Sequence, residues 1–205
     1  MKLHLASGNA HKVQEFQALA DASALGGLEI LSARAVGGMP PVVEDTGTFH
    51  GNALKKARAL QALVGKEAWV LSDDSGICVD ALGGLPGVES AYYAGPQGDS
   101  AANLAKLVEV MKAVPRAERG ASFVCVLCLV GPEGRTLHVE GRCEGALLVS
   151  PQGGAGFGYD PLFVPDGYDR SFAELGEADK NRLSHRARAW AKLTQWLREL
   201  PADQR

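Results

Sequence analysis

Hydrophobic positions in the first third of the chain recur with two spacings, and each spacing predicts a different element. Alternate positions are apolar in "KLHLA", as in a strand, whereas steps of three and four residues are typical of a helix. In chain order the pattern predicts a strand, a helix, a second strand and an amphipathic helix, at residues 3–5, 13–20, 28–31 and 49–64. Strands and helices therefore alternate here.

Beyond this part, strands predominate. The pattern predicts short strands at 69–72 and 77–81 and a helix at 104–111. Longer strands follow at 121–130 and 135–149, then a glycine-rich loop at 153–161 and a final helix at 184–199. The nearly continuous apolar stretch 121–130 is typical of a strand that is buried on both faces. The polar run Asp73 to Gly76 is expected just past the end of the strand at 69–72. The whole order predicts an α/β protein with a mixed sheet, in which sites tend to form at strand ends.

Composition narrows the class of protein. A chain of 205 residues with 46% hydrophobic content can bury a substantial core, and no linker divides it, so a single domain over 1–205 is expected. The longest apolar runs are too short to cross a membrane, and the N-terminus has no signal-peptide pattern. The four cysteines lie in apolar contexts, which fits structural thiols in a reducing cytoplasm. A net charge of −3 argues against a general nucleic-acid binder.

The run "SGNAHK" (7–12) joins a predicted strand to a predicted helix. Backbone amides at a helix N-terminus attract anions, and Lys12 can reach back to the same anion from one turn into the helix. The Walker pattern G-x-x-x-x-G-K-[ST] is absent. The alternative interpretation is an ordinary turn that Asn9 caps.

Acidic residues stand at two places that suit a divalent cation. Asp73 and Asp74 offer hard oxygen ligands of the kind that Mg²⁺ prefers, and a carboxylate off the metal could activate water. A capping turn would also explain this pair. Glu44 and Asp45 precede the helix that carries Lys56, and by themselves they could be helix-start acids on a solvated helix. The histidines are too scattered for a histidine-based metal centre.

The run "GFGYDP" (156–161) brings aromatic rings and a carboxylate into a flexible loop. Phe157 or Tyr159 could stack on a nucleobase, although a packed β-bulge would have a similar sequence. Basic residues gather after it, as Lys180, His185 and Arg186, where a charged helix start is the alternative. Taken together, the anion site, lysines, acids and aromatic loop predict a Mg²⁺-dependent nucleoside triphosphate site.

Five motifs in order resemble the inosine triphosphate pyrophosphatase family from residue 3 to about residue 197. They are "SGNAHK", "TFHGNALKKAR", "DDSGICVDALGGLPGVESA", "GFGYDPLF" and "DKNRLSHR". The resemblance implies a two-lobed α/β fold with a long mixed β-sheet flanked by helices, and a nucleotide cleft between the lobes. It also implies a homodimer that cleaves ITP, dITP or XTP between the α- and β-phosphates, releasing pyrophosphate, with Mg²⁺ as cofactor and Mn²⁺ as a substitute.

The resemblance also implies a role for individual residues. Asp74 would be the catalytic base and a metal ligand, with Glu44 as the second ligand and Asp45 as the alternative in a register shifted by one. Substrate would be bound by Ser7, Gly8, Asn9, Ala10, His11, Lys12, Lys56, Ser75, Phe157, Gly158, Tyr159, Asp160, Lys180, His185 and Arg186. Tyr92 departs from the pattern, because the family usually has an arginine there.

Two other functions remain open at this point. One is a Mg²⁺-dependent pyrophosphatase that acts on canonical or modified pyrimidine nucleotides. The other is a nucleotide sensor without turnover, against which the acid pair argues because binding alone needs no water-activating carboxylate.

Overall fold

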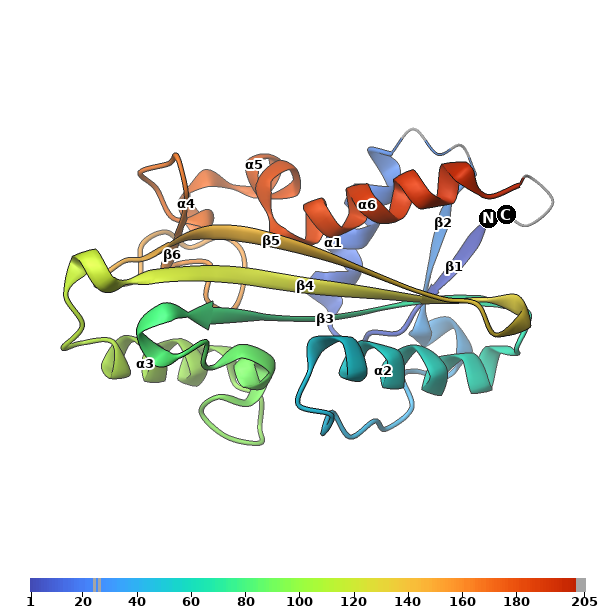
Figure 1. Cartoon of the computed structure of the whole chain (residues 1–205), viewed down its shortest axis with the longest axis horizontal. Coiled ribbons are helices and arrows are strands. Elements are labelled where there is room, and N and C mark those ends of the chain that lie inside the picture. The colour runs from blue at the N-terminus through green and yellow to red at the C-terminus, as the bar shows by residue number, and fades with distance from the viewer. Residues whose placement is uncertain (24, 26, 202–205) are drawn as a thin grey trace. The chain divides into compact units, whose positions relative to one another are not determined.

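Six strands form one mixed sheet in the order β2-β1-β3-β4-β5-β6. The computed structural model in Figure 1 describes residues 1–23, 25 and 27–201. The strands are β1 (Lys2–Leu5), β2 (Glu29–Ser32), β3 (Trp69–Val79), β4 (Gly120–Val130), β5 (Thr136–Leu147) and β6 (Phe163–Pro165). β1 pairs in parallel with β2 and β3, whereas β6 is antiparallel to β5. The mixed sheet expected from the sequence is confirmed.

Helices make up the other half of the α/β pattern. They are α1 (Ala10–Asp21), α2 (Phe49–Val64), α3 (Ser100–Val110), α4 (Phe172–Leu175), α5 (Glu177–Leu183) and α6 (His185–Glu199). The amphipathic helix predicted at 49–64 is α2, and it begins where the Thr48 side chain accepts a hydrogen bond from the Gly51 amide. The sequence did not predict the short elements β6, α4 and α5, because an element of so few residues is too short for a periodic pattern to be recognised.

The chain divides into two compact units, each with its own core. The first contains Met1–Asp74, Cys125–Glu140 and the chain from Ala189 onward, and the second contains Ser75–Val124 and Gly141–Arg188. The two lobes expected from the resemblance correspond to these units. The last four residues of the predicted 1–205 domain lie outside the described residues, and the single domain stays a prediction.

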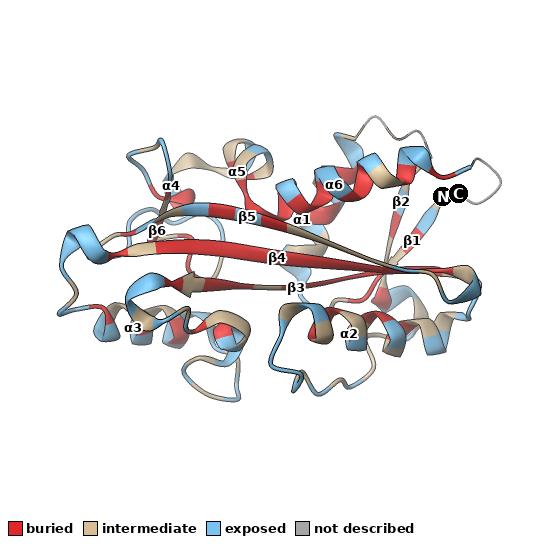
Figure 2. Ribbon diagram, in the orientation of Figure 1, coloured by how far each residue is buried: buried red, intermediate tan, exposed pale blue. Residues whose placement is uncertain are grey.

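In the first unit, helices cover both faces of the strands (Figure 1). Ala53, Ala57 and Leu60 of α2 belong to one buried cluster with Val70 of β3 and Val126 of β4. On the other face, α1 and α6 meet through a contact between two aromatic rings, those of Phe16 and Trp190. The part of β4 in this unit is buried throughout (Figure 2), as expected for a strand with helices on both faces.

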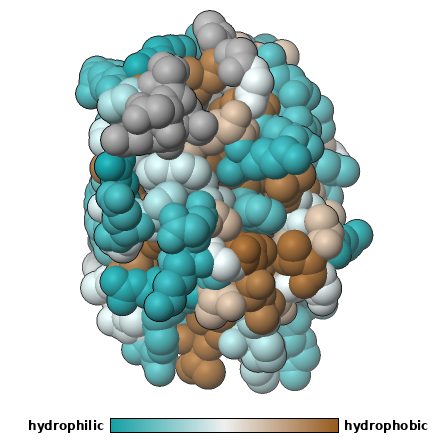
Figure 3. All heavy atoms as spheres, turned by 90° about the vertical axis from the view of Figure 1, so that its right-hand side faces the viewer, coloured by the Kyte–Doolittle hydropathy of each residue, from teal (hydrophilic) through white to brown (hydrophobic). Residues whose placement is uncertain are grey.

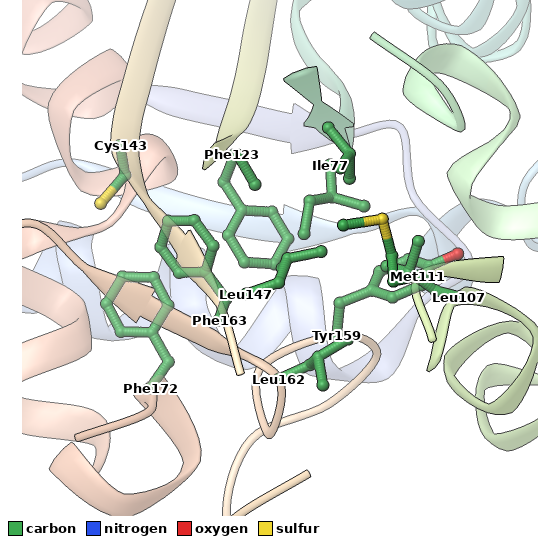
Figure 4. Close-up of a cluster of buried hydrophobic side chains, with 12 residues drawn as sticks. Ile77, Leu107, Met111, Phe123, Cys143, Leu147, Tyr159, Leu162, Phe163 and Phe172 are labelled. Carbon is green, nitrogen blue, oxygen red and sulfur yellow. The ribbon is translucent and has the colours of Figure 1, made fainter. Parts of the chain in front are cut away.

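The second unit packs α3, α4 and β6 around the far halves of the long strands. Its core contains Ile77, Leu107, Met111, Phe123, Cys143, Leu147, Tyr159, Leu162, Phe163 and Phe172 (Figure 4). Phe123 and Phe163 meet edge to face with their ring centroids 4.8 Å apart. This geometry is a favourable one for aromatic pairs.

One element differs from its prediction in a way that matters for the site. The sequence placed Asp73 and Asp74 just past a strand end, but β3 continues through both residues to Val79. Gly76 permits this, because a Cβ at that position would lie 2.1 Å from the carbonyl oxygen of Gly87. The acidic pair therefore lies inside a strand, and both side chains are buried.

The surface in Figure 3 is mostly hydrophilic, with hydrophobic side chains in separate groups. The large hydrophobic residues that the described part exposes are Val43, Leu63, Leu85, Tyr92, Val110 and Val149. Among the described residues, no helix has the length and apolar character needed to cross a bilayer.

Candidate active site

The turn between β1 and α1 is held by side chains of its own residues. The Asn9 side chain accepts hydrogen bonds from the amides of His11 and Lys12, at 2.9 and 3.3 Å. The Asn9 amide in turn donates to the Ser7 hydroxyl at 3.2 Å. The strand–turn–helix predicted for "SGNAHK" is confirmed, and Asn9 is the helix cap. Anion binding by this turn stays a prediction.

Asp73 and Asp74 point to opposite faces of β3, because successive side chains of a strand alternate. Lys12, near the start of α1, places its Nζ 2.9 Å from Asp73 Oδ2. On the α2 face, Lys56 Nζ lies 2.7 Å from Asp74 Oδ1. Two adjacent carboxyls are therefore tolerated inside a strand because each meets a lysine from a different helix.

Lys56 also joins Asp74 to the loop that precedes α2. Its Nζ lies 2.8 Å from Glu44 Oε2, so the two carboxyls converge on one ammonium group. The Glu44 and Asp74 side chains also form a hydrogen bond with each other. We call Lys12, Glu44, Lys56, Asp73 and Asp74 the strand cluster.

The titration of this cluster follows from its burial and its charges. Burial raises the pKa of Asp74 to about 7; the Glu44 hydrogen bond adds to this rise, and Lys56 opposes it. Burial also acts to raise the pKa of Glu44, but the charge and hydrogen bond of Lys56, the hydrogen bond with Asp74 and the charge of Lys12 together outweigh it, so the pKa is lowered. The pKa of Lys56 is raised, because the carboxylates outweigh its desolvation. One proton is thus shared between two carboxyls and stays mainly on Asp74.

Glu44 and Asp45, the two alternatives for the second metal ligand, have different partners. Asp45 is exposed and pairs with Lys55, which lowers the pKa of the Asp45 carboxyl. Glu44 is the one that contacts Asp74 and Lys56. This placement favours Glu44 as the partner of Asp74.

The donor set of the strand cluster fits a divalent cation. Two carboxyls that share a proton can release it and offer the same oxygens to a metal ion. The described residues contain no group of three or more His, Cys, Asp or Glu side chains that could hold a metal. A metal here would take its other ligands from phosphate and water, an arrangement that is common for Mg²⁺.

A second group of candidate residues meets in the second unit. Lys180 Nζ lies 2.6 Å from Asp160 Oδ2, and both side chains are buried. The same Asp160 oxygen accepts a hydrogen bond from the Phe157 amide at 2.8 Å, so it holds the turn of the glycine-rich loop. Gly156 is needed there, because its φ is +78° and a Cβ would lie 2.3 Å from Asp160 Oδ2. We call Phe157, Asp160, Lys180, His185 and Arg186 the loop cluster.

Cationic groups of the loop cluster face the Phe157 ring. Lys180 Nζ is 4.4 Å from the ring centroid, and Arg186 Cζ is 6.0 Å from it. Arg186 also donates to the Ser75 hydroxyl at 3.1 Å. His185 stacks on Phe123 with 4.8 Å between ring centroids. The structure thus brings Ser75, from a distant part of the sequence, to four other predicted residues: Phe157, Asp160, Lys180 and Arg186.

The Tyr159 ring is not exposed for stacking on a nucleobase. It is buried in the core of the second unit (Figure 4), and its hydroxyl donates to the Ser90 carbonyl at 2.8 Å. Burial raises the pKa of this hydroxyl. Phe157, which is half-buried, is therefore the better placed of the two aromatic rings. Gly158, beside it, has a φ of +62°.

Asn52 belongs to the site although the sequence interpretation did not select it. It is buried, and its amide nitrogen lies 3.4 Å from Asp74 Oδ2. A signal was present, because Asn52 and Lys56 are four residues apart and so share one face of α2.

Comparisons with known proteins were consistent with one another. A model described as the Ham1 family matches residues 3–196. The chain is 62% identical to the dITP/XTP pyrophosphatase of Opitutus terrae, over 97% of this chain and 99% of the relative. A HAM1 protein from Coxiella burnetii has a similar structure, with a TM-score of 0.85, 35% identity, and coverage of 98% of this chain and 100% of that one.

A structure from Mycobacterium abscessus, described as a nucleoside-triphosphatase and dITP/XTP pyrophosphatase, is 42% identical with a TM-score of 0.74. That match covers 94% of this chain and 98% of the other. The resemblance indicated by the five motifs is confirmed by the family match and by these relatives.

Proposed function

The chain belongs to the Ham1 family, and from that premise we propose that it hydrolyses non-canonical purine nucleoside triphosphates. The products are the nucleoside monophosphate and pyrophosphate, and the substrates are ITP, dITP and XTP. The relatives named dITP/XTP pyrophosphatase support this function. Within the structure, the observation that carries it is the convergence of the Glu44 and Asp74 carboxyls on the ammonium group of Lys56.

The reaction needs a water molecule and a place for its proton. Water attacks the α-phosphorus, the bond from that phosphorus to the oxygen bridging to the β-phosphorus breaks, and pyrophosphate leaves. In our proposal Asp74 accepts the proton of the water. A pKa of about 7 suits this role, because a base works best when its pKa is near the working pH.

Glu44 and Asp74 are the proposed ligands for Mg²⁺, which Mn²⁺ can replace. When bound, such a cation neutralises phosphate charge and lowers the barrier to phosphoryl transfer. The two carboxyls lie close enough to meet the same Lys56 ammonium group, which supports the assignment. Oxygen ligands also favour Mg²⁺ or Mn²⁺ over zinc.

The triphosphate is assigned to the turn before α1 and to Lys56. The proposed contacts are Ser7, Gly8, Asn9, Ala10, His11, Lys12 and Lys56. Amides at the start of α1 and the charge of Lys12 support anion binding. Because Lys12 and Lys56 already neutralise carboxylates, binding would exchange those carboxylate contacts for phosphate contacts.

The nucleobase is assigned to the loop cluster, together with Ser75, Gly158 and Tyr159. Phe157 would stack on the base, and Arg186 and His185 would donate to the C6 keto oxygen of ITP or XTP. ATP carries an amine at C6, so an arginine donor would face another donor there. GTP shares the keto group, so its exclusion would come from crowding at C2 by the backbone of 157–160.

Assembly and location are extensions of the same resemblance. We propose a cytoplasmic homodimer that acts on free nucleotides and does not bind nucleic acid. The apolar contexts of the four cysteines in the sequence support a reducing compartment. Tyr92 is half exposed, and because the family usually has an arginine there, this chain lacks one positive charge at that position.

One substrate panel tests the function against its alternatives. Pyrophosphate release is measured from ITP, XTP, dUTP and ATP, with and without Mg²⁺. We expect release from ITP and XTP that depends on Mg²⁺. Preference for dUTP would favour a pyrimidine pyrophosphatase, and tight ITP binding without release would favour a sensor.

A further inference from the structure

Asn52 has a buried carboxamide whose two ends contact two different parts of the strand cluster. Its Oδ1 accepts hydrogen bonds from the Thr46 amide at 3.2 Å and from the Thr46 hydroxyl at 2.8 Å. Its Nδ2 lies 3.4 Å from Asp74 Oδ2. The side chain is 1% exposed. It therefore links the segment just after Glu44 to the carboxyl group that faces Glu44.

The orientation of this carboxamide is determined by its surroundings. The Thr46 amide can only donate, so the Asn52 oxygen must face it and the Asn52 nitrogen must face Asp74. The two Asp74 oxygens then have different donors: Lys56 holds Oδ1 at 2.7 Å and Asn52 holds Oδ2. Two donors from successive turns of one helix define the plane of the carboxyl group.

The same helix restrains the loop that carries Glu44. Lys55 Nζ donates to the Val43 carbonyl at 3.0 Å, and Asn52 binds Thr46 on the other side of Glu44. Close packing at the helix start adds to this, because a Cβ at Gly51 would lie 2.3 Å from the Thr46 hydroxyl oxygen. Glu44 thus lies in a short segment that α2 holds at both ends.

We propose that Asn52 is a positioning residue for divalent-cation binding, which sets the Asp74 carboxyl plane and the Glu44 loop at the same time. The proposal rests on the function proposed above, because it takes Glu44 and Asp74 as the ligands. Outer partners of metal ligands act in this way, and their loss typically costs about 10–100-fold in affinity or activity.

The test measures Mn²⁺ binding to the nucleotide-free protein by electron paramagnetic resonance, alongside kcat and KM for ITP with Mg²⁺. We expect Asn52→Ala to weaken Mn²⁺ binding about 10-fold or more and to lower kcat, with KM changing less than about threefold. The matched control is Asn103→Ala. Asn103 is also buried and bonds two backbone groups, the Ala94 amide and the Ala91 carbonyl, in the second unit.

Asn103→Ala should lose stability without losing Mn²⁺ affinity. If Asn52→Ala also loses only stability, Asn52 is structural and the proposal is overturned. Should Asn52→Ala fail to fold, Thr46→Val replaces it. Thr46 is exposed, and its backbone amide still donates a hydrogen bond to Asn52 in this variant. Thr46→Val should weaken Mn²⁺ binding by a few-fold, and unchanged Mn²⁺ affinity would overturn the proposal.

Failure of the proposed function gives a different result. A wild-type protein that binds Mn²⁺ but releases no pyrophosphate lacks the proposed function, and the Mn²⁺ affinities still decide the role of Asn52. A wild-type protein that binds no Mn²⁺ overturns the role of Asn52 directly.

Discussion

The strand cluster and the loop cluster both gather charged side chains that are buried or partly buried, but they are built from different parts. The strand cluster takes its carboxyls from β3 and the 41–47 loop and its lysines from α1 and α2, and two of its carboxyls share a proton. The loop cluster is assembled within about one sixth of the chain, from the glycine-rich loop, α5 and the start of α6.

This difference teaches which chemistry each cluster suits. Carboxyls predominate among the members of the strand cluster, and they can exchange a proton for a cation. Nitrogen donors and an aromatic ring predominate in the loop cluster, and these groups suit the recognition of a base. The comparison therefore supports the proposal that catalysis belongs to the strand cluster and base recognition to the loop cluster.

Metal removal should have the largest effect, and it should depend on the strand cluster. We expect EDTA to abolish pyrophosphate release from ITP and excess Mg²⁺ or Mn²⁺ to restore it, whereas a zinc-selective chelator has no effect. Glu44→Gln should raise the Mg²⁺ concentration for half-maximal rate about 10-fold or more. Arg186→Ala is the control from the loop cluster and should leave that concentration unchanged. Full activity in EDTA would contradict the assignment.

Asp74→Asn should lower kcat by on the order of 10²–10⁴, because it removes the base and weakens a metal ligand. The fold should remain, since asparagine keeps the shape of the side chain and can still accept a hydrogen bond from Lys56. Asp73→Asn is the neighbouring control on the opposite face of β3, and its effect on kcat should be much smaller. If Asp73→Asn instead caused the larger loss of kcat, the roles of the two residues would be reversed.

Arg186→Ala should change specificity more than it changes the chemical step. We expect kcat/KM for ITP to fall by on the order of 10²-fold or more and the ITP/ATP ratio of kcat/KM to narrow, because the donor to the keto oxygen is lost. Ser75→Ala removes the hydroxyl that Arg186 contacts but keeps the guanidinium, so its effect should be smaller. Equal losses for ITP and ATP would mean that Arg186 binds phosphate.

The smallest effect concerns the stability of the metal-free protein. The pKa of Asp74 is raised from 3.8 to about 7, so the folded state holds a proton that the unfolded state releases between those values. The free energy of unfolding contributed by this group must therefore fall as the pH rises through this range, and Asp74→Asn should remove the fall.

Chemical denaturation in EDTA at pH 5 and pH 8 measures the contribution of Asp74 to the free energy of unfolding. Relative to wild type, Asp74→Asn should become more stable at pH 8 than at pH 5, by on the order of 1 kcal/mol. Asp45→Asn is the control, because the lowered pKa of Asp45 places its titration below both pH values. A stability difference between Asp74→Asn and wild type that is the same at both pH values would contradict the raised pKa.

The sequence by itself determined the family and most of the regular elements. Helical spacing was sufficient for α2, and a nearly continuous apolar run was sufficient for β4, because both patterns extend over ten residues or more. The five motifs contain every residue of both clusters except Glu44, which precedes the second motif by four residues. Short elements such as β6 and α4 repeat nothing and were not predicted.

Only the tertiary structure decided how the named side chains are used. The acidic pair reads as a strand end because two charges are costly inside a sheet, but lysines from α1 and α2 remove that cost. From the sequence, Tyr159 and Phe157 are equally good candidates for stacking on a base. Packing in the core of the second unit buries only Tyr159. Asn52 gains its proposed role from contacts with Thr46 and Asp74, which lie 6 and 22 residues away. Contacts over such separations depend on how the elements pack, which spacing along one chain does not encode.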